Sequence, residues 1–170
     1  MPPAYAVSPK VAGAGRPEAR IMDTHLFSQL PLDENAVVMH CVAALRAAQW
    51  RVERSATTIE RGIDIVAERN GARMYVEAKG VTSSKSGSNR YGMLQTSSQI
   101  FIQVSTALYT TAQLRAAEPH AEVMIAVPDH ECMRRRLARI EPVLECARIG
   151  VLWVGSDGCV TPWNTSVLSA

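Results

Sequence analysis

The sequence predicts an α/β domain of three layers, in which helices cover both faces of a mixed central sheet. Segments with apolar residues at helical spacing alternate with short runs in which apolar and polar residues alternate. Their order is helix, three strands, helix and strand, followed by helix, strand and strand. An Asn70-Gly71 pair separates two alternating runs, which is a strong hairpin signal because both residues tolerate positive φ. Together these observations indicate a sheet with helices on both sides.

The 170 residues, of which 47% are hydrophobic, suit one compact domain. Residues 1–30 hold four prolines and two glycines with little periodicity, so we expect a flexible N-terminal arm before a domain over residues 31–170. No apolar run reaches the roughly 18 residues of a membrane span, and the start lacks the pattern of an export signal. We therefore expect a cytoplasmic protein with no membrane partner.

Each element follows from local signals. Asp33 is a plausible N-cap for a helix that ends near Ala48. Pro142 is expected to kink or divide the helix that begins near Asp129, which can cap it. The remaining predicted elements are a strand over Trp50–Arg54, strands over Gly62–Arg69 and Arg73–Lys79, a helix from Ser97 or Ser98 to just before Pro119, and strands over Glu122–Val127, Val151–Val154 and Cys159–Thr161.

The hairpin carries the most informative side chains. A two-residue turn pairs Arg69 with Ala72, and the same register places Asp64 opposite Glu77, with Lys79 on the same face. Opposed carboxylates about 5 Å apart repel by roughly 3 kcal/mol at an effective dielectric constant of 20. A proton or a cation relieves that repulsion, and oxygen ligands favour Mg²⁺ or Mn²⁺ over zinc. A surface hairpin with an acidic pair is the alternative.

The segments G-I-D-I and V-E-A-K-G, with twelve residues between their acids, resemble the PD-(D/E)XK nuclease superfamily, which includes restriction-endonuclease-like and Holliday-resolvase-like enzymes. The resemblance spans about residues 33–127 and implies a restriction-endonuclease-like fold with an αβββαβ core, here followed by a C-terminal αββ extension. It implies that Asp64 and Glu77 bind the metal and that Lys79 positions the attacking water. Ile63 stands where many members have proline.

Two further positions come from this resemblance. Glu34 resembles an acid that joins the metal site from the first helix, although the helix dipole alone favours an acid there. Gln99 resembles a glutamine that some branches carry in the site, although a solvated helix residue is an equally good interpretation. Lys79, at a strand end, is expected to be replaceable without harm to the core.

Positive charge follows the hairpin. Between Ala78 and Ala117 there is no Asp or Glu. The expected contacts to a DNA backbone in this stretch come from Ser83, Ser84, Lys85 and Arg90. A second basic cluster comprises Arg134, Arg135, Arg136 and Arg139, for which the sequence alone favours a solvated helix face.

The sequence thus predicts a Mg²⁺- or Mn²⁺-dependent endonuclease that cleaves DNA. The alternative is a non-catalytic module on the same fold that binds nucleic acid or a protein. A serine or cysteine hydrolase lacks its G-x-S-x-G motif here. RNA as the substrate and a homodimer as the functional state stay open.

Overall fold

A six-stranded mixed sheet with its strands in chain order forms the centre of the protein. The computed structural model describes residues 32–55, 62–82 and 92–169. Strands β1 to β3 are antiparallel, β3 to β5 are parallel, and β6 is antiparallel to β5. The strands are β1 (Arg51–Ser55), β2 (Ile65–Arg69), β3 (Ala72–Ala78), β4 (Glu122–Pro128), β5 (Ile149–Val154) and β6 (Val160–Trp163).

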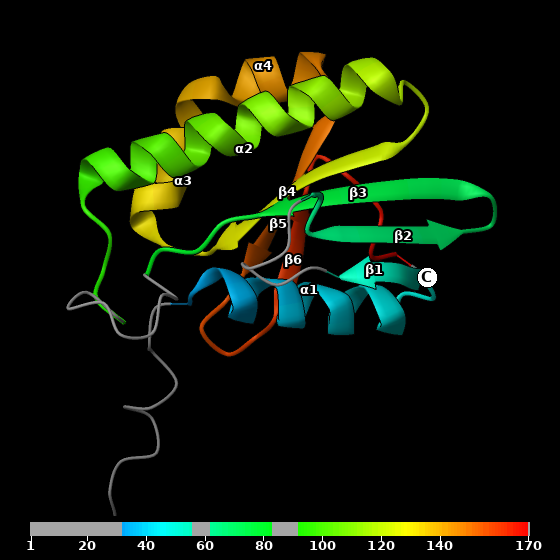
Figure 1. Cartoon of the computed structure of the whole chain (residues 1–170), viewed down its shortest axis with the longest axis horizontal. Helices are drawn as coiled ribbons and strands as arrows, with labels where there is room; N and C mark the ends of the chain where they lie inside the picture. The colour runs from blue at the N-terminus through cyan, green and yellow to red at the C-terminus, as the bar shows by residue number, and fades with distance from the viewer. Residues whose placement is uncertain (1–31, 56–61, 83–91, 170) are drawn as a thin grey trace, which may run out of the picture.

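Helices cover both faces of this sheet (Figure 1). Helix α1 (Glu34–Ala47) lies on one face, and α2 (Ser97–Ala117), α3 (Glu131–Leu137) and α4 (Glu141–Cys146) lie on the other. The order gives an αβββαβ core with a C-terminal αββ extension, so the predicted three-layer α/β fold with a mixed central sheet is confirmed. Within the described ranges no helix has the length and apolarity that a membrane crossing requires.

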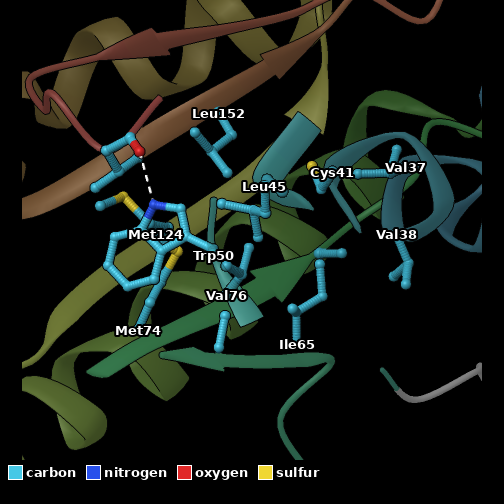
Figure 2. Packing of buried hydrophobic residues seen from close by; sticks show 14 of the residues in the cluster. Val37, Val38, Cys41, Leu45, Trp50, Ile65, Met74, Val76, Met124 and Leu152 are labelled. Atoms are coloured by element: carbon cyan, nitrogen blue, oxygen red, sulfur yellow. Dashed lines mark hydrogen bonds between the residues drawn. The ribbon is translucent and has the colours of Figure 1, made fainter. Parts of the chain in front are cut away.

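Each face of the sheet has its own apolar core. Under α1, Trp50 is buried and its indole Nε1 donates a hydrogen bond to Val167 O at 2.7 Å, which ties the C-terminal segment to this layer (Figure 2). On the opposite face, Ile125 and Val151 pack beneath α2 to α4. Because the parallel strands β4 and β5 are buried on both faces, they consist of nearly continuous apolar residues. Each large side chain fully buried there contributes roughly 1.5–3 kcal/mol.

Several element boundaries differ by a few residues from the sequence prediction. His130, not Asp129, is the N-cap of α3 and accepts a hydrogen bond from Cys132 N. Asp129 instead binds the guanidinium of Arg134, so its carboxylate does not accept a hydrogen bond from the start of the helix. The last strand lies slightly later than expected because residues 155–159 form the turn. Pro142 does mark a division, since a 3₁₀ turn (Ala138–Ile140) separates α3 from α4.

The predicted hairpin register is confirmed. Arg69 pairs with Ala72 and the ladder continues to Ile65 and Val76, around a turn in which Asn70 and Gly71 have φ of 54° and 80°. However, β2 begins at Ile65 rather than at Gly62, so Asp64 precedes the strand. The carboxylate of Asp64 accepts the Ala78 N–H at 2.7 Å, and so takes a donor that a longer ladder would have used.

Gly80 lets the first turn of α1 contact the end of β3. A Cβ atom at residue 80 would lie 2.5 Å from Glu34 N and 2.7 Å from the carbonyl carbon of Asp33. The adjacent Val81 N–H donates to Leu32 O at 3.0 Å. Asp33 caps the helix by accepting the Ala36 N–H at 2.8 Å. The start of α1 is therefore fixed beside the residues that follow β3.

We predict that Gly80→Ala destabilises the protein by about 1–3 kcal/mol, the usual cost of an extra methyl group in a tightly packed place. The reason is that the obstructing atoms are backbone atoms of α1 and cannot rotate away. Urea unfolding measures the change. Gly71→Asn is the comparison variant, because no heavy atom lies within 4 Å of its new Cβ and its only cost is the positive φ, which Asn tolerates best among side-chain-bearing residues. Equal stabilities for Gly80→Ala and wild type would show that the close contact is not needed.

Candidate active site

A buried lysine lies at the end of β3. Lys79 is 8% exposed, and its Nζ donates to Glu77 Oε1 at 2.7 Å and to Ala78 O at 2.8 Å. Glu34 Oε2 lies 3.7 Å from the same Nζ, at ion-pair distance. A buried ammonium group is costly unless it is paired and hydrogen-bonded. The contacts to Glu77, Ala78 and Glu34 supply those partners.

Two buried carboxylates complete the cluster. Asp64 is 8% exposed and Glu77 is 6% exposed. The last pair of the β2–β3 ladder is Ile65 with Val76. Asp64 comes just before Ile65 and Glu77 just after Val76, so the two acids extend the predicted register by one pair. We call Glu34, Asp64, Glu77 and Lys79 the acid–lysine cluster. Its members come from the first turn of α1, the residue before β2 and the end of β3, so the cluster forms only when these elements pack together.

Burial shifts the charges of this cluster. Burial raises the pKa of Glu77 and of Glu34; the positive charge of Lys79 opposes this rise, and the charge of Asp64 adds to it. Burial also raises the pKa of Asp64, against the hydrogen bond from Ala78 and the charge of Lys79. For Lys79, burial favours a lower pKa, but the hydrogen bond to Glu77 and the charges of the acids outweigh it and raise the pKa. Lys79 is therefore charged at neutral pH, and the three carboxyl groups around it outnumber this single positive charge.

Gln99 lies at the start of α2 and has a structural contact there. Its Oε1 accepts the Thr96 N–H at 2.9 Å, and the Thr96 side chain accepts the Gln99 N–H, which is a reciprocal capping box. None of the hydrogen bonds that Gln99 makes in the described ranges joins the acid–lysine cluster. The pattern T-S-S-Q in the sequence is a capping-box signal that explains this placement. A role for Gln99 in catalysis stays a prediction.

The residues expected to contact a DNA backbone, Ser83, Ser84, Lys85 and Arg90, lie outside the described residues, as does the N-terminal arm over residues 1–30. Both expectations stay predictions. The flanks of the loop are described: Thr82 and Leu94 form an antiparallel bridge, and Gln95 N donates to Val81 O at 2.8 Å. The two flanks of this segment are therefore joined to each other two or three residues after Lys79.

No protein-family model and no curated protein matches the sequence. Two crystal structures are distantly similar. An fdxN element excision controlling factor protein from Anabaena variabilis is 22% identical, with a TM-score of 0.46 over 78% of this chain and 98% of that chain. An XisH family protein from Nostoc punctiforme is 20% identical, with a TM-score of 0.44 over 81% of this chain and 98% of that chain. Similarity this distant carries no conclusion about activity, which rests on the residues of this chain.

The donor set of the cluster suits a hard divalent cation. Its acids offer carboxylate oxygens, which Mg²⁺ and Mn²⁺ prefer. In the parts of the chain that the structure describes, no three Asp, Glu, His or Cys side chains converge so as to hold an ion. The expected set of Asp64, Glu77 and Glu34 is thus not preformed. Two carboxylates still fit, because Mg²⁺ in nucleotide-processing sites is commonly held by one or two carboxylates together with water and substrate phosphate.

We predict that the free energy of unfolding of Glu34→Gln, compared with that of wild type, becomes more favourable as the pH rises from acidic to neutral. Because burial raises the pKa of Glu34 above its ordinary value of 4.5, its contribution to stability is fully present below that value. The contribution is lost as the pH rises through the folded-state pKa, and glutamine removes this loss. Metal-free urea unfolding from pH 4 to 8 measures the effect. Glu131→Gln, an exposed acid in the first turn of α3, is the control and should show no such gain. If the variant instead loses stability relative to wild type as the pH rises, Lys79 and the helix dipole outweigh burial at Glu34.

Proposed function

We propose that this protein is a metal-dependent endonuclease that cleaves DNA. One observation carries the proposal: Lys79 is buried and charged among three carboxylates that burial makes harder to ionise. Strongly perturbed acids and bases gathered at one place are typical of catalytic sites. The order Asp64, Glu77, Lys79 on a hairpin is the order that the resemblance to PD-(D/E)XK nucleases implies.

Lys79 would act as a positioned cation rather than as a base. Its raised pKa keeps the ammonium protonated, so Lys79 does not accept a proton from water at neutral pH. Two of its three N–H donors are bound, to Glu77 and Ala78. The third faces Glu34, whose Oε2 lies 3.7 Å from Nζ, so it is held more loosely than the other two and can turn to a substrate or a water. It would orient the attacking water and offset charge that develops on the phosphate.

Asp64 and Glu77 would hold Mg²⁺ or Mn²⁺. Such an ion, when bound, polarises a phosphate and makes a bound water more acidic. Both carboxylates keep one oxygen without a bond in the described structure, since Asp64 uses Oδ2 for Ala78 and Glu77 uses Oε1 for Lys79. Glu34 would hold Lys79 in place from α1. Nearby, the acid-free stretch between Ala78 and Ala117 leaves the surface open to a polyanion.

A non-catalytic binding module is the second candidate. It is favoured by the observation that Lys79 is already paired and that no three-ligand metal site is preformed within the described ranges. In that case the cluster is a structural ion-pair network, which can also shift pKa values. The two candidates differ in whether divalent metal binds and whether a phosphodiester bond breaks.

We predict that Mg²⁺ or Mn²⁺ raises the melting temperature and that Asp64→Asn abolishes the shift. A ligand that binds only the folded state stabilises it by about 2.7 kcal/mol at one hundred times its dissociation constant. Asparagine keeps an oxygen to accept the Ala78 N–H, so the variant loses charge rather than a structural bond. Differential scanning fluorimetry with and without chelator checks this. Asp129→Asn is the control because Asp129 binds Arg134, away from the cluster. An equal shift for Asp64→Asn and wild type would place the ion elsewhere.

Lys79→Met is predicted to slow cleavage by about 10²-fold or more, the scale seen when one positioned catalytic group is lost. Truncation to alanine is a poorer test than the sequence suggested. Lys79 is buried, and removing one partner of a buried ion pair costs about 3–5 kcal/mol. Methionine has an unbranched side chain of similar length to that of lysine and so fills the same space. Without the positive charge of Lys79, the neighbouring acids are expected to bind a proton more readily. Supercoiled plasmid, branched DNA and RNA are incubated with Mg²⁺ or Mn²⁺, with chelator as the blank.

The outcome of that assay decides between the two candidates. Metal-dependent cleavage by wild type that falls in Lys79→Met supports the nuclease. Preference for RNA over both DNA substrates would keep the chemistry but change the substrate. If folded wild type cuts no substrate with either metal, the binding module replaces the nuclease.

A further inference from the structure

A basic pocket of about 160 Å³ lies between the first turn of α2 and the side of α3. It is lined by Ser97, Ile100, Cys132, Arg135, Arg136 and Arg139, and so contains three arginines and no acid. We call it the arginine pocket. The sequence alone favoured a solvated helix face for this arginine cluster. The structure instead divides the cluster between two environments.

Arg134 faces away from the pocket. Its guanidinium lies 4.6 Å from the Trp153 ring centroid and binds Asp129, so its charge is neutralised within the C-terminal layer. The other three arginines lie toward α2. This division follows from helical spacing, because at 3.6 residues per turn Arg134 lies about 200° around the axis of α3 from Arg136.

Arg136 is held in place before any ligand binds. It donates to Ser97 O at 2.6 Å and to Ser97 Oγ at 2.7 Å, and its guanidinium lies 5.5 Å from the Phe101 ring centroid. Arg139 has no hydrogen-bond or ion-pair partner among the described residues. Arg135 pairs with Glu131 on an exposed surface, where such pairs are weak. A fixed guanidinium beside free or weakly paired ones is the arrangement that binds a phosphate oxyanion.

The chain path places this pocket near the acid–lysine cluster. Val81 follows Lys79 by two residues and is hydrogen-bonded to Gln95, which precedes Ser97 by two residues. At a maximum of about 3.6 Å per residue, Lys79 and Ser97 are therefore separated by no more than about 20 Å. Successive phosphates of one strand in a duplex rise by about 3.4 Å, so the separation corresponds to at most about six nucleotides.

We propose that the arginine pocket binds a backbone phosphate of the DNA strand that the acid–lysine cluster cuts. The inference rests on the proposed function. Contacts from three guanidinium groups to a phosphate would fix the position of the strand. They would not depend on the base sequence. Its distance from Lys79 sets how many nucleotides separate the held phosphate from the scissile one.

Cys132 provides a direct probe of occupancy because it lines the pocket and is exposed. Wild-type protein in chelator is treated with N-ethylmaleimide, a neutral thiol reagent, with and without a short DNA duplex or single strand. Mass spectrometry follows each cysteine. We expect DNA to slow modification of Cys132 several-fold. Cys146 and Cys159 are also exposed but do not line the pocket, so their rates should not change. Equal rates at Cys132 with bound DNA would overturn the inference.

The paired substitution Arg135→Gln with Arg139→Gln tests the charges. Two lost phosphate contacts should lower the slope of affinity against salt by about two and weaken binding at least about tenfold. Arg51→Gln with Arg73→Gln removes the same charge from exposed positions on β1 and β3 and should leave both quantities near wild type. Binding is measured by fluorescence anisotropy in chelator, so that the chemical step plays no part.

The outcomes separate this inference from the proposed function. Cleavage by wild type, together with unchanged binding and salt slope in the pocket variant, would overturn the pocket and leave the nuclease standing. A weakened pocket variant in a protein that cuts nothing would retain the phosphate site and reject the nuclease. Protection of Cys132 by inorganic phosphate but not by DNA would identify a small-anion site and overturn the proposal.

Discussion

The ammonium group of Lys79 sits inside the protein, and the surrounding structure is arranged around that buried charge. An unpaired ion in such a place costs several kcal/mol, so its partners must be held in position. Glu77 and the Ala78 carbonyl come from the same strand, whereas Glu34 comes from α1. The helix reaches the strand end because Gly80 has no side chain to separate them. The close packing of α1 against β3 is thus what turns a hairpin into a site.

The acid–lysine cluster is not expected to stabilise the folded protein. Burial raises the pKa values of Asp64, Glu77 and Glu34, so the folded protein resists the full negative charge of its own site. Apolar residues of similar volume in place of a buried ion pair are often neutral or stabilising. A divalent cation would relieve the excess charge, and a phosphate could then approach. The arginine pocket would complement this site, because the DNA strand that we propose as its ligand could span the separation of about 20 Å or less.

Much of the hairpin geometry could be predicted from the sequence, because it depends on local rules. Asn70-Gly71 determines the turn, and the turn determines which residues lie opposite one another. The rest depends on packing between distant segments. The start of β2 is set by the side chain of Asp64, which takes the Ala78 N–H. The role of Gly80 also depends on such packing, because only the position of α1 shows that a side chain would not fit there. The arginine pocket likewise forms only where α3 and the turn after it meet α2. Burial of Lys79 also escaped prediction, since a strand end in sequence says nothing of what covers it.

The central claim is that the excess negative charge of the acid–lysine cluster is a site for a divalent cation. Crystals of the protein with a short DNA duplex and Mn²⁺ would test it directly through the anomalous scattering of manganese. We expect an anomalous peak within coordination distance of one oxygen each of Asp64 and Glu77. We also expect that Lys79 remains beside Glu77. A map with DNA bound but no peak at these carboxylates would contradict the account and leave a structural ion-pair network in its place.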